Sequence, residues 1–297
     1  MQKTLVTGGA GFIGVHLVTR LLRDSDDQII VLDNLKRASA RGFPSDSEDR
    51  LTILSDDIRD FPSVARAVSG CRLVYHLAAQ SNVMGAVTDP DYSFSTNVIG
   101  TYNVLRASSE AGVRRVVFTS SREAYGEAAT LPVDEDRPLL PKSAYGASKM
   151  AGEAYARAFA ASNGMAVAIV RLANVYGPGD SGRVIPLWLD AAREGRDLEV
   201  YGGEQLLDFL WVGKAVEALI AAGERGLRAP TNIGSGKGTP ILELARRIIE
   251  VTNSSSKILR SPARNEEVVR FIADTRRMRD EGITPEDDPL AHLAEMA

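Results

Sequence analysis

The sequence predicts a doubly wound α/β protein built on a parallel sheet that is buried on both faces. In the first half of the chain, apolar runs of four to seven residues alternate with stretches of helical periodicity, which is typical of parallel strands joined by helices. A glycine-rich turn also links the first apolar run to the first helical stretch. The expected strands are Lys3–Thr7, Gln28–Leu32, Leu51–Leu54, Leu73–Leu77, Val116–Thr119 and Ala166–Arg171, and the expected helices are Phe12–Arg23, Phe61–Ser69, Ser93–Ala111 and Ser143–Asn163.

The first strand leads into the turn Thr7–Gly14, which reads TGGAGFIG, and then into an amphipathic helix. Glycine at these positions permits an unusual φ angle, a close approach of the backbone to a pyrophosphate, and tight packing of the helix on the sheet. The free N–H groups at the start of the helix favour phosphate binding. The turn therefore predicts a dinucleotide site rather than a turn without a ligand. The expected contacts are Gly8, Gly11, Phe12, Ile13 and Gly14.

Two carboxylates follow the next strands, where a dinucleotide needs hydrogen-bond acceptors. Asp33 lies 19 residues after Gly14, where an acidic residue accepts from ribose hydroxyls and repels a 2′-phosphate. This favours NAD, although Lys36 and Arg37 are near enough to keep NADP open. Asp57 either accepts from the adenine amino group or caps the next helix. The expected cofactor contacts at this end are Asp33, Asn34, Asp57 and Ile58.

A tyrosine and a lysine, Tyr145 and Lys149, are four residues apart in the stretch expected to form the fourth helix. This spacing places both side chains on one helix face. A phenol with a pKa of about 10 is a poor base at neutral pH, but a nearby ammonium group and an oxidised nicotinamide would favour the phenolate. The pair predicts a base with its activating cation, and an exposed helix pair is the alternative.

After Arg171 the predicted elements become shorter, and turn-rich stretches separate them. Helices are expected at Arg183–Glu194 and Thr239–Val251, the second with Thr239 as its N-cap. We predict a NAD-binding domain over residues 1–172 and a smaller substrate-binding lobe over residues 173–297, part of which returns to the first sheet.

Composition excludes several classes of protein. The formal net charge of −4 provides no positive field for nucleic acid. No apolar run approaches 18 residues, so no membrane span is expected. The single cysteine, Cys71, excludes an internal disulfide and fits a reducing compartment, so a cytoplasmic location is expected. No His, Asp and Glu cluster has metal-ligand spacing, so no metal is expected.

Five motifs occur in order along the chain. They are TGGAGFIG at Thr7–Gly14, HLAAQ at His76–Gln80, TSSREAYG at Thr119–Gly126, YGASK at Tyr145–Lys149 and RLANVYGPG at Arg171–Gly179. With them the chain resembles an extended short-chain dehydrogenase/reductase of the NAD-dependent sugar-nucleotide epimerase/dehydratase family, from Lys3 to about Asp274. The resemblance implies a Rossmann sheet with a smaller C-terminal lobe.

The resemblance also implies roles for individual residues. Tyr145 would take the proton of a sugar hydroxyl, usually at C4, Lys149 would tune it and bind the nicotinamide ribose, and Ser121 would bond to the same sugar oxygen. The cofactor pocket would include Leu77, Ala78, Ala79 and Asn97, the last also stabilising the active-site helix. The expected substrate-binding residues are Ser81, Arg122, Asn174, Arg183 and Arg264, with Arg264 as the clamp on the diphosphate.

One departure from the family pattern concerns the diphosphate. Leu207 stands where the family commonly has a second diphosphate-binding arginine, and Lys214 stands where it usually has an acidic residue. Either Arg183 or Lys214 replaces the missing cation, or the substrate is not a standard nucleoside-diphosphate sugar.

A second departure is the pair Arg122-Glu123 after Ser121. Dehydratases and decarboxylases of the family carry a Glu at the position of Glu123, which can remove a C5 proton. Arg122 cannot protonate a leaving group, since its pKa stays above about 12, which disfavours a 4,6-dehydratase. Arg122 could instead act as the counter-ion of a uronate, or the two could form a solvated pair beside the pocket.

We therefore predict a NAD-dependent nucleoside-diphosphate-sugar 4-epimerase, with a uridine diphosphate sugar as substrate. A dehydratase or uronate decarboxylase that uses Glu123 is the alternative, and a redox-inactive NAD-binding sensor is a more distant one. The alanine-rich stretch Ser143–Asn163 and the stretch Thr96–Ala111 would permit a homodimer with a four-helix contact.

Overall fold

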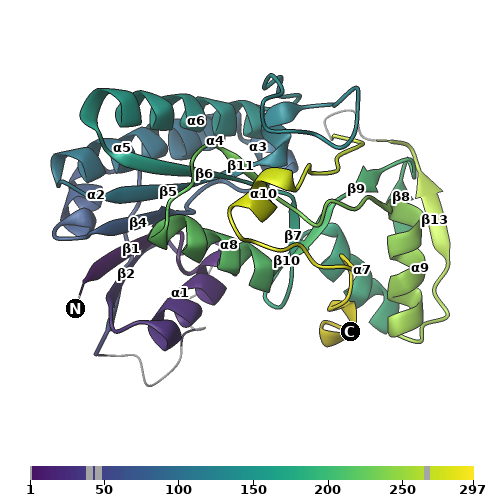
Figure 1. Cartoon of the computed structure of the whole chain (residues 1–297). Helices are drawn as coiled ribbons and strands as arrows, with labels where there is room; N and C mark the ends of the chain where they lie inside the picture. Colours follow the sequence, from purple (N-terminus) through teal and green to yellow (C-terminus); the bar gives the residue numbers. More distant parts are fainter. Residues whose placement is uncertain (1, 38–42, 44–48, 264–267) are drawn as a thin grey trace.

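A single parallel sheet forms the centre of the protein. The computed structural model describes residues 2–37, 43, 49–263 and 268–297. Within these residues, seven strands form a sheet in the order β11-β6-β5-β4-β1-β2-β3, with every neighbouring pair parallel (Figure 1). The strands are β1 (Lys3–Thr7), β2 (Gln28–Leu32), β3 (Leu51–Leu54), β4 (Leu73–His76), β5 (Arg115–Ser121), β6 (Ala166–Leu172) and β11 (Thr231–Ile233).

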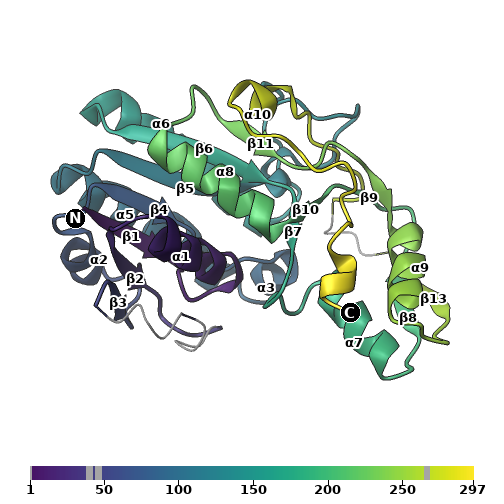
Figure 2. The same ribbon diagram turned by 60° about the horizontal axis from the view of Figure 1, so that its bottom comes forward.

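Helices cover both faces of this sheet. On one face, α1 (Phe12–Asp24) packs against α8 (Val212–Glu224), and on the other α5 (Thr101–Glu110) packs between α2 (Phe61–Val68) and α6 (Ala144–Asn163) (Figures 1 and 2). Each layer has its own apolar core: the first includes Leu17, Val18, Val216 and Leu219, and the second includes Val64, Leu105, Phe118 and Ala156. The doubly wound α/β architecture predicted from the sequence is confirmed.

The second half of the chain contributes to both parts of the molecule. Strand β11 extends the sheet beside β6, with Thr231 opposite Val170, and α8 covers it. The remaining elements form the smaller lobe, which has a third apolar core that includes Trp188, Leu244, Ile248 and Leu293. They are β7 (Asn174–Tyr176), α7 (Val184–Arg193), β8 (Leu198–Tyr201), β9 (Leu206–Leu207), β10 (Phe209–Trp211), β12 (Thr239–Pro240), α9 (Ile241–Val251), β13 (Ile258–Ser261) and η4 (Leu293–Glu295). The short helix α10 (Arg276–Asp280) instead lies against β11, and its Met278 belongs to the first apolar core. A domain division at residue 172 stays a prediction.

The helix expected over Ser93–Ala111 is confirmed: α4 (Pro90–Phe94), a π-helical segment η2 (Ser95–Gly100) and α5 follow one another without a break, preceded by the short helix α3 (Val83–Thr88). One prediction of local structure was wrong. Thr239 is not the N-cap of α9, because Thr239 lies in β12 and pairs with Leu207 of β9, and the N-cap is Pro240. Here a strand pairing outweighs the local pattern.

A buried ion pair joins α6 to the sheet. Arg171 on β6 donates from Nε and Nη2 to the carboxylate of Glu153 on α6, at 2.8 and 2.7 Å. The side chains of Glu153 and Arg171 are 0% and 2% exposed. Ser120 on β5 donates to the same carboxylate at 2.6 Å. The network therefore links α6 to the last residues of β5 and β6.

Candidate active site

A large cavity lies at the carboxyl ends of the parallel strands, the edge at which α/β sheets of this topology bind ligands. It has a volume of about 920 Å³ and extends from the glycine-rich turn to the smaller lobe. The predicted site residues that line it are Gly8, Gly11, Phe12, Ile13, Gly14, Asp33, Asn34, Ile58, Leu77, Ala78, Ala79, Ser81, Ser121, Arg122, Glu123, Tyr145, Lys149, Asn174 and Arg183.

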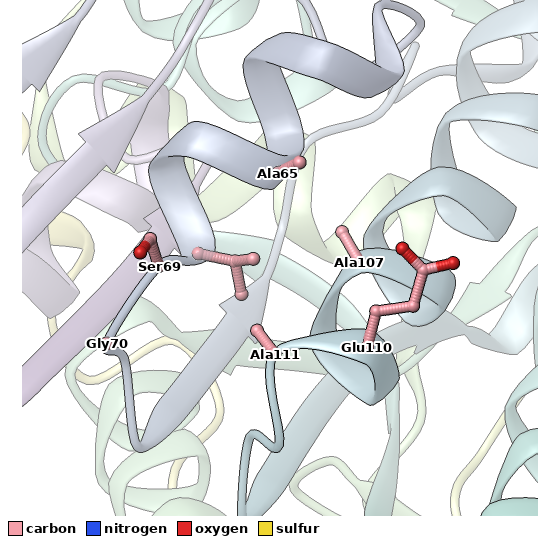
Figure 3. A pocket seen from close by; sticks show the side chains of 7 residues that line it. Ala65, Ser69, Gly70, Ala107, Glu110 and Ala111 are labelled. Atoms are coloured by element: carbon pink, nitrogen blue, oxygen red, sulfur yellow. The ribbon is translucent and has the colours of Figure 1, made fainter.

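A second, smaller cavity of about 290 Å³ lies between the ends of α2 and α5 (Figure 3). It is lined by Ala65, Val68, Ser69, Gly70, Ala107, Glu110 and Ala111. The ionisable side chain among these, Glu110, pairs with Arg106 at 2.8 Å and both are exposed. This cavity offers no chemistry.

The glycine-rich turn fits a dinucleotide. Gly8 has a φ of 70°, and a Cβ there would lie 2.6 Å from the backbone nitrogen of Ala78, while a Cβ on Gly14 would lie 2.2 Å from the Gly8 carbonyl oxygen. Gly11 is the N-cap of α1 without a side-chain cap, and it lines the cavity. The turn therefore presents the N-terminus of α1 to the cavity, which is where a pyrophosphate binds.

The predicted ribose acceptor, Asp33, directly follows β2 and faces the glycine-rich turn. The Asp33 carboxylate accepts from the backbone N–H groups of Ala10 at 3.1 Å and Leu35 at 2.9 Å, which orients it at the edge of the cavity. The two cations that had kept NADP open also line the cavity. Lys36 Nζ lies 3.5 Å from the ring centroid of Tyr92, and Arg37 donates to Ser81 Oγ at 2.9 Å.

Two predicted cofactor residues, Asp57 and Asn97, are not among the residues that line the cavity. Burial tends to raise the pKa of Asp57, but hydrogen bonds from Arg59 and Asn34 outweigh it and lower the pKa to about 2. Asn97, in the π-helical segment, accepts from Gln80 N–H at 2.7 Å and donates to Ser148 Oγ at 2.9 Å. Asn97 thus fastens the loop after β4 to α6, next to Lys149.

The candidate catalytic groups meet at the start of α6. The Ser121 hydroxyl is hydrogen-bonded to Tyr145, and Lys149 Nζ lies 5.9 Å from the centroid of the Tyr145 ring. Burial raises the pKa of Tyr145, whereas the charge of Arg183 and the Ser121 hydrogen bond act to lower it. Lys149 Nζ donates to the Thr119 carbonyl at 2.8 Å, and burial lowers the pKa of Lys149 to about 8, opposed by the charge of Glu153.

The pair Arg122–Glu123 forms part of the cavity wall directly after Ser121, in the short helix η3 (Arg122–Tyr125). Its two charges are 2.9 Å apart, and the side chains are only 12% and 6% exposed. Arg122 Nε also donates to Asn174 Oδ1 at 3.1 Å. The pair is therefore buried at the site, and the alternative of a solvated pair was wrong.

The half of the cavity in the smaller lobe is mainly apolar. Leu207 lines it, so an alkyl chain is present where a cation was expected. Of the two replacements considered, Arg183 lines the cavity, whereas Lys214 pairs with Glu217 at 2.8 Å outside it. Arg264 lies outside the described residues.

Sequence reasoning missed two residues that support the site. Asp180, 2% exposed, pairs with Arg183 at 2.6 Å, and the Asp-x-x-Arg spacing in the turn before α7 was the available signal. Glu153 follows Tyr145 and Lys149 at the same spacing of four residues, so all three fall on one face of α6. That regular spacing could have identified it.

The fold and the site define a dinucleotide-binding protein with a serine, a tyrosine and a lysine at the cofactor edge of a Rossmann sheet. The profile of the NAD dependent epimerase/dehydratase family matches residues 4–234. The chain belongs to this family, and NAD is its cofactor.

Three similar proteins illustrate the match. A putative UDP-glucose 4-epimerase of Methanocaldococcus jannaschii is 35% identical over 96% of this chain and 93% of that protein. The UDP-glucose 4-epimerase of Thermotoga maritima, solved with UDP-glucose, has a TM-score of 0.93 and 30% identity over 99% of this chain and 96% of that chain. The UDP-glucose 4-epimerase of Thermus thermophilus, solved with NAD, has a TM-score of 0.91 and 30% identity over 99% of this chain and 97% of that chain.

The described residues contain neither a membrane-spanning helix nor a metal-binding cluster. No helix among them is long and apolar enough to cross a membrane. In the same ranges, no group of three or more His, Cys, Asp and Glu side chains could hold a metal ion.

Proposed function

We propose that the protein is a NAD-dependent nucleoside-diphosphate-sugar 4-epimerase that acts through transient oxidation at C4. The proposal rests on one observation: Ser121, Tyr145 and Lys149 lie together in the same cavity as the glycine-rich turn. The 4-epimerase relatives that cover nearly the whole chain support it.

The chain's own residues supply the proton chemistry. When bound, NAD accepts a hydride from C4 of the sugar and later returns it. Tyr145 Oη takes the proton from the O4 hydroxyl, and Ser121 Oγ is placed to hydrogen-bond to the same oxygen. Lys149, buried one turn further along α6, supplies positive charge that stabilises the phenolate. On the return step Tyr145 gives the proton back to O4.

Inversion requires the 4-keto sugar to turn its other face to the cofactor, so the cavity must hold it loosely.

A test follows from the fate of the C4 hydrogen. Incubated with UDP-glucose in deuterated water, the enzyme is expected to form UDP-galactose without carbon-bound deuterium, as read by NMR and mass spectrometry. Deuterium at C5, or loss of water, would contradict the proposal.

Elimination chemistry at C5 is the second candidate function. The observation that favours it is Glu123, whose Oε2 is buried at the cavity wall without a hydrogen-bond partner and which could serve as the C5 base. Under the epimerase proposal, Glu123→Gln should leave UDP-glucose turnover mostly intact. A loss of 100-fold or so, the scale of removing a general base, would favour elimination.

Arg183 is proposed to hold the diphosphate in place of the cation missing at Leu207. The charge of Arg183 also lowers the pKa of Tyr145, so Arg183→Gln is expected to raise that pKa. Since the base acts as phenolate, the acid limb of the kcat/KM–pH profile should move to higher pH, and KM should rise at every pH. Lys214→Gln, a cation outside the cavity, is the matched control and should change neither. An unchanged acid limb in Arg183→Gln would refute the electrostatic role.

A homodimer is proposed through the helices beside the site. Phe94, Ile99, Tyr102 and Tyr155, on α4, η2, α5 and α6, are between 38% and 57% exposed, and a patch of large apolar side chains is typical of an interface. Light scattering at micromolar concentration is expected to give twice the mass of one chain. The Tyr155→Arg variant is expected to have a lower measured mass, closer to that of the monomer. A monomeric wild-type protein would contradict this.

A further inference from the structure

A hydrogen bond joins the cofactor half of the cavity to the half in the smaller lobe. His16 on α1 and residues 178–183, which precede α7, all line the cavity. The Nε2 atom of His16 lies 2.8 Å from the carbonyl oxygen of Pro178, 162 residues away in the chain. A carbonyl oxygen can only accept, so Nε2 carries a proton and donates. The bond therefore ties the helix of the dinucleotide turn to the segment 178–183.

The segment 178–183 has internal bonds that link its backbone to Arg183. The N–H of Asp180 donates to the carbonyl of Gly177 at 3.1 Å, and the carboxylate of Asp180 pairs with Arg183 at 2.6 Å. Gly179 and Gly182 have φ angles of 83° and 71°, and a Cβ on either would meet nothing within 4 Å. Glycine in such open positions leaves the backbone many conformations. The position of Arg183 therefore depends on what holds the segment.

Arg183 lies near both the cofactor turn and the candidate base. Its guanidinium carbon is 5.7 Å from the ring centroid of Phe12, the first residue of α1, and its charge acts on Tyr145. The Phe12 ring in turn packs edge-on against His16, with the centroids 5.8 Å apart and an interplanar angle of 89°. His16, Phe12 and Arg183 are therefore successive neighbours on the cavity wall.

We propose that His16 is a positioning residue for the diphosphate of the substrate: through Pro178 it holds the segment 178–183 against α1 and keeps Arg183 in place. The inference rests on the proposed function, which assigns the diphosphate to Arg183. His16 itself need not touch the substrate. It lowers the conformational entropy that the segment loses when the substrate binds. Because α1 also carries the pyrophosphate site, the bond fixes the substrate relative to the cofactor, as hydride transfer at C4 requires.

The test measures binding without turnover. UDP is titrated into the protein at saturating NAD in a calorimeter. His16→Leu removes the donor and is expected to weaken UDP binding by about three- to tenfold, the scale of one hydrogen bond. His16→Gln places an amide donor at a similar reach and is expected to restore most of the affinity. Thr19→Val, on the same helix but outside the cavity, is the matched control and should bind UDP as the wild type does.

A double-mutant cycle separates positioning from general damage to α1. If His16 acts through Arg183, then adding His16→Leu to Arg183→Gln should change the Kd of UDP by less than about twofold. An additive loss in the double variant would overturn the inference. So would wild-type affinity in His16→Leu, an equal loss in the Leu and Gln variants, or no binding of UDP to the wild type.

Epimerisation of UDP-glucose by the wild-type protein is measured separately. A non-additive cycle without epimerisation would support the role of His16 and reject the epimerase. Epimerisation with an additive cycle would reject the role of His16 alone.

Discussion

Tyr145→Phe is expected to lower kcat for UDP-sugar epimerisation by about 10²–10⁴-fold, the range that a positioned general base contributes. The substitution removes one oxygen and keeps the ring, so the wall of the cavity stays intact. NAD binding, governed by the glycine-rich turn, should be retained. Coupled-enzyme kinetics measure the first effect, and cofactor released on denaturation, measured by chromatography, tests the second.

Tyr155→Phe is the matched control. Tyr155 lies on the same helix as Tyr145, and the substitution removes the same hydroxyl group. The Tyr155 ring, however, is 43% exposed and lies outside the cavity. Its kcat should equal that of the wild type. Full activity in Tyr145→Phe would show that another group takes the O4 proton, and the proposed mechanism would fall.

Glu153→Ala should destabilise the protein by about 3–5 kcal/mol, because it leaves Arg171 as a buried and unpaired cation. Arg171 is 2% exposed and donates two hydrogen bonds to the Glu153 carboxylate. Ser120 also loses its acceptor. Urea unfolding followed by circular dichroism gives the change in the free energy of unfolding from the shift in midpoint.

The control uses the third partner of the same carboxylate. Arg157 pairs with Glu153 at 2.8 Å, but its side chain is 53% exposed, so Arg157→Ala should cost less than about 1 kcal/mol. Similar losses in both variants would mean that burial of Arg171 does not set the energy of the network.

The sequence was most informative where function requires a fixed local spacing. The glycines of Thr7–Gly14 and the interval between Tyr145 and Lys149 depend on a single turn and a single helix, so their placement at one cavity could be predicted. The positions of the first six strands along the chain followed from the alternation of apolar runs. That β11 completes the sheet depends on contacts between distant segments, and no local pattern specifies its neighbour.

Other features could not be predicted because distant partners determine them. The π-helical segment Ser95–Gly100 directs Asn97 toward Gln80 and Ser148, and those two partners lie 17 and 51 residues away in the chain. Similarly, the spacing of Arg122 and Glu123 is compatible with a solvated pair or a buried one. Only the packing of Asn174 and the smaller lobe around them decides between the two.

The late return of the chain to the sheet limits how the gene can be divided. An expression fragment that stops at residue 172 would omit β11 and α8, and the α1 side chains Leu17 and Val18 would lose the apolar layer that they share with Val216 and Leu219. Such a fragment is expected to aggregate. A cofactor-binding fragment has to extend at least to Ile233, close to residue 234, where the match to the family profile ends. The cofactor-binding half is thus a unit in space but not in the gene.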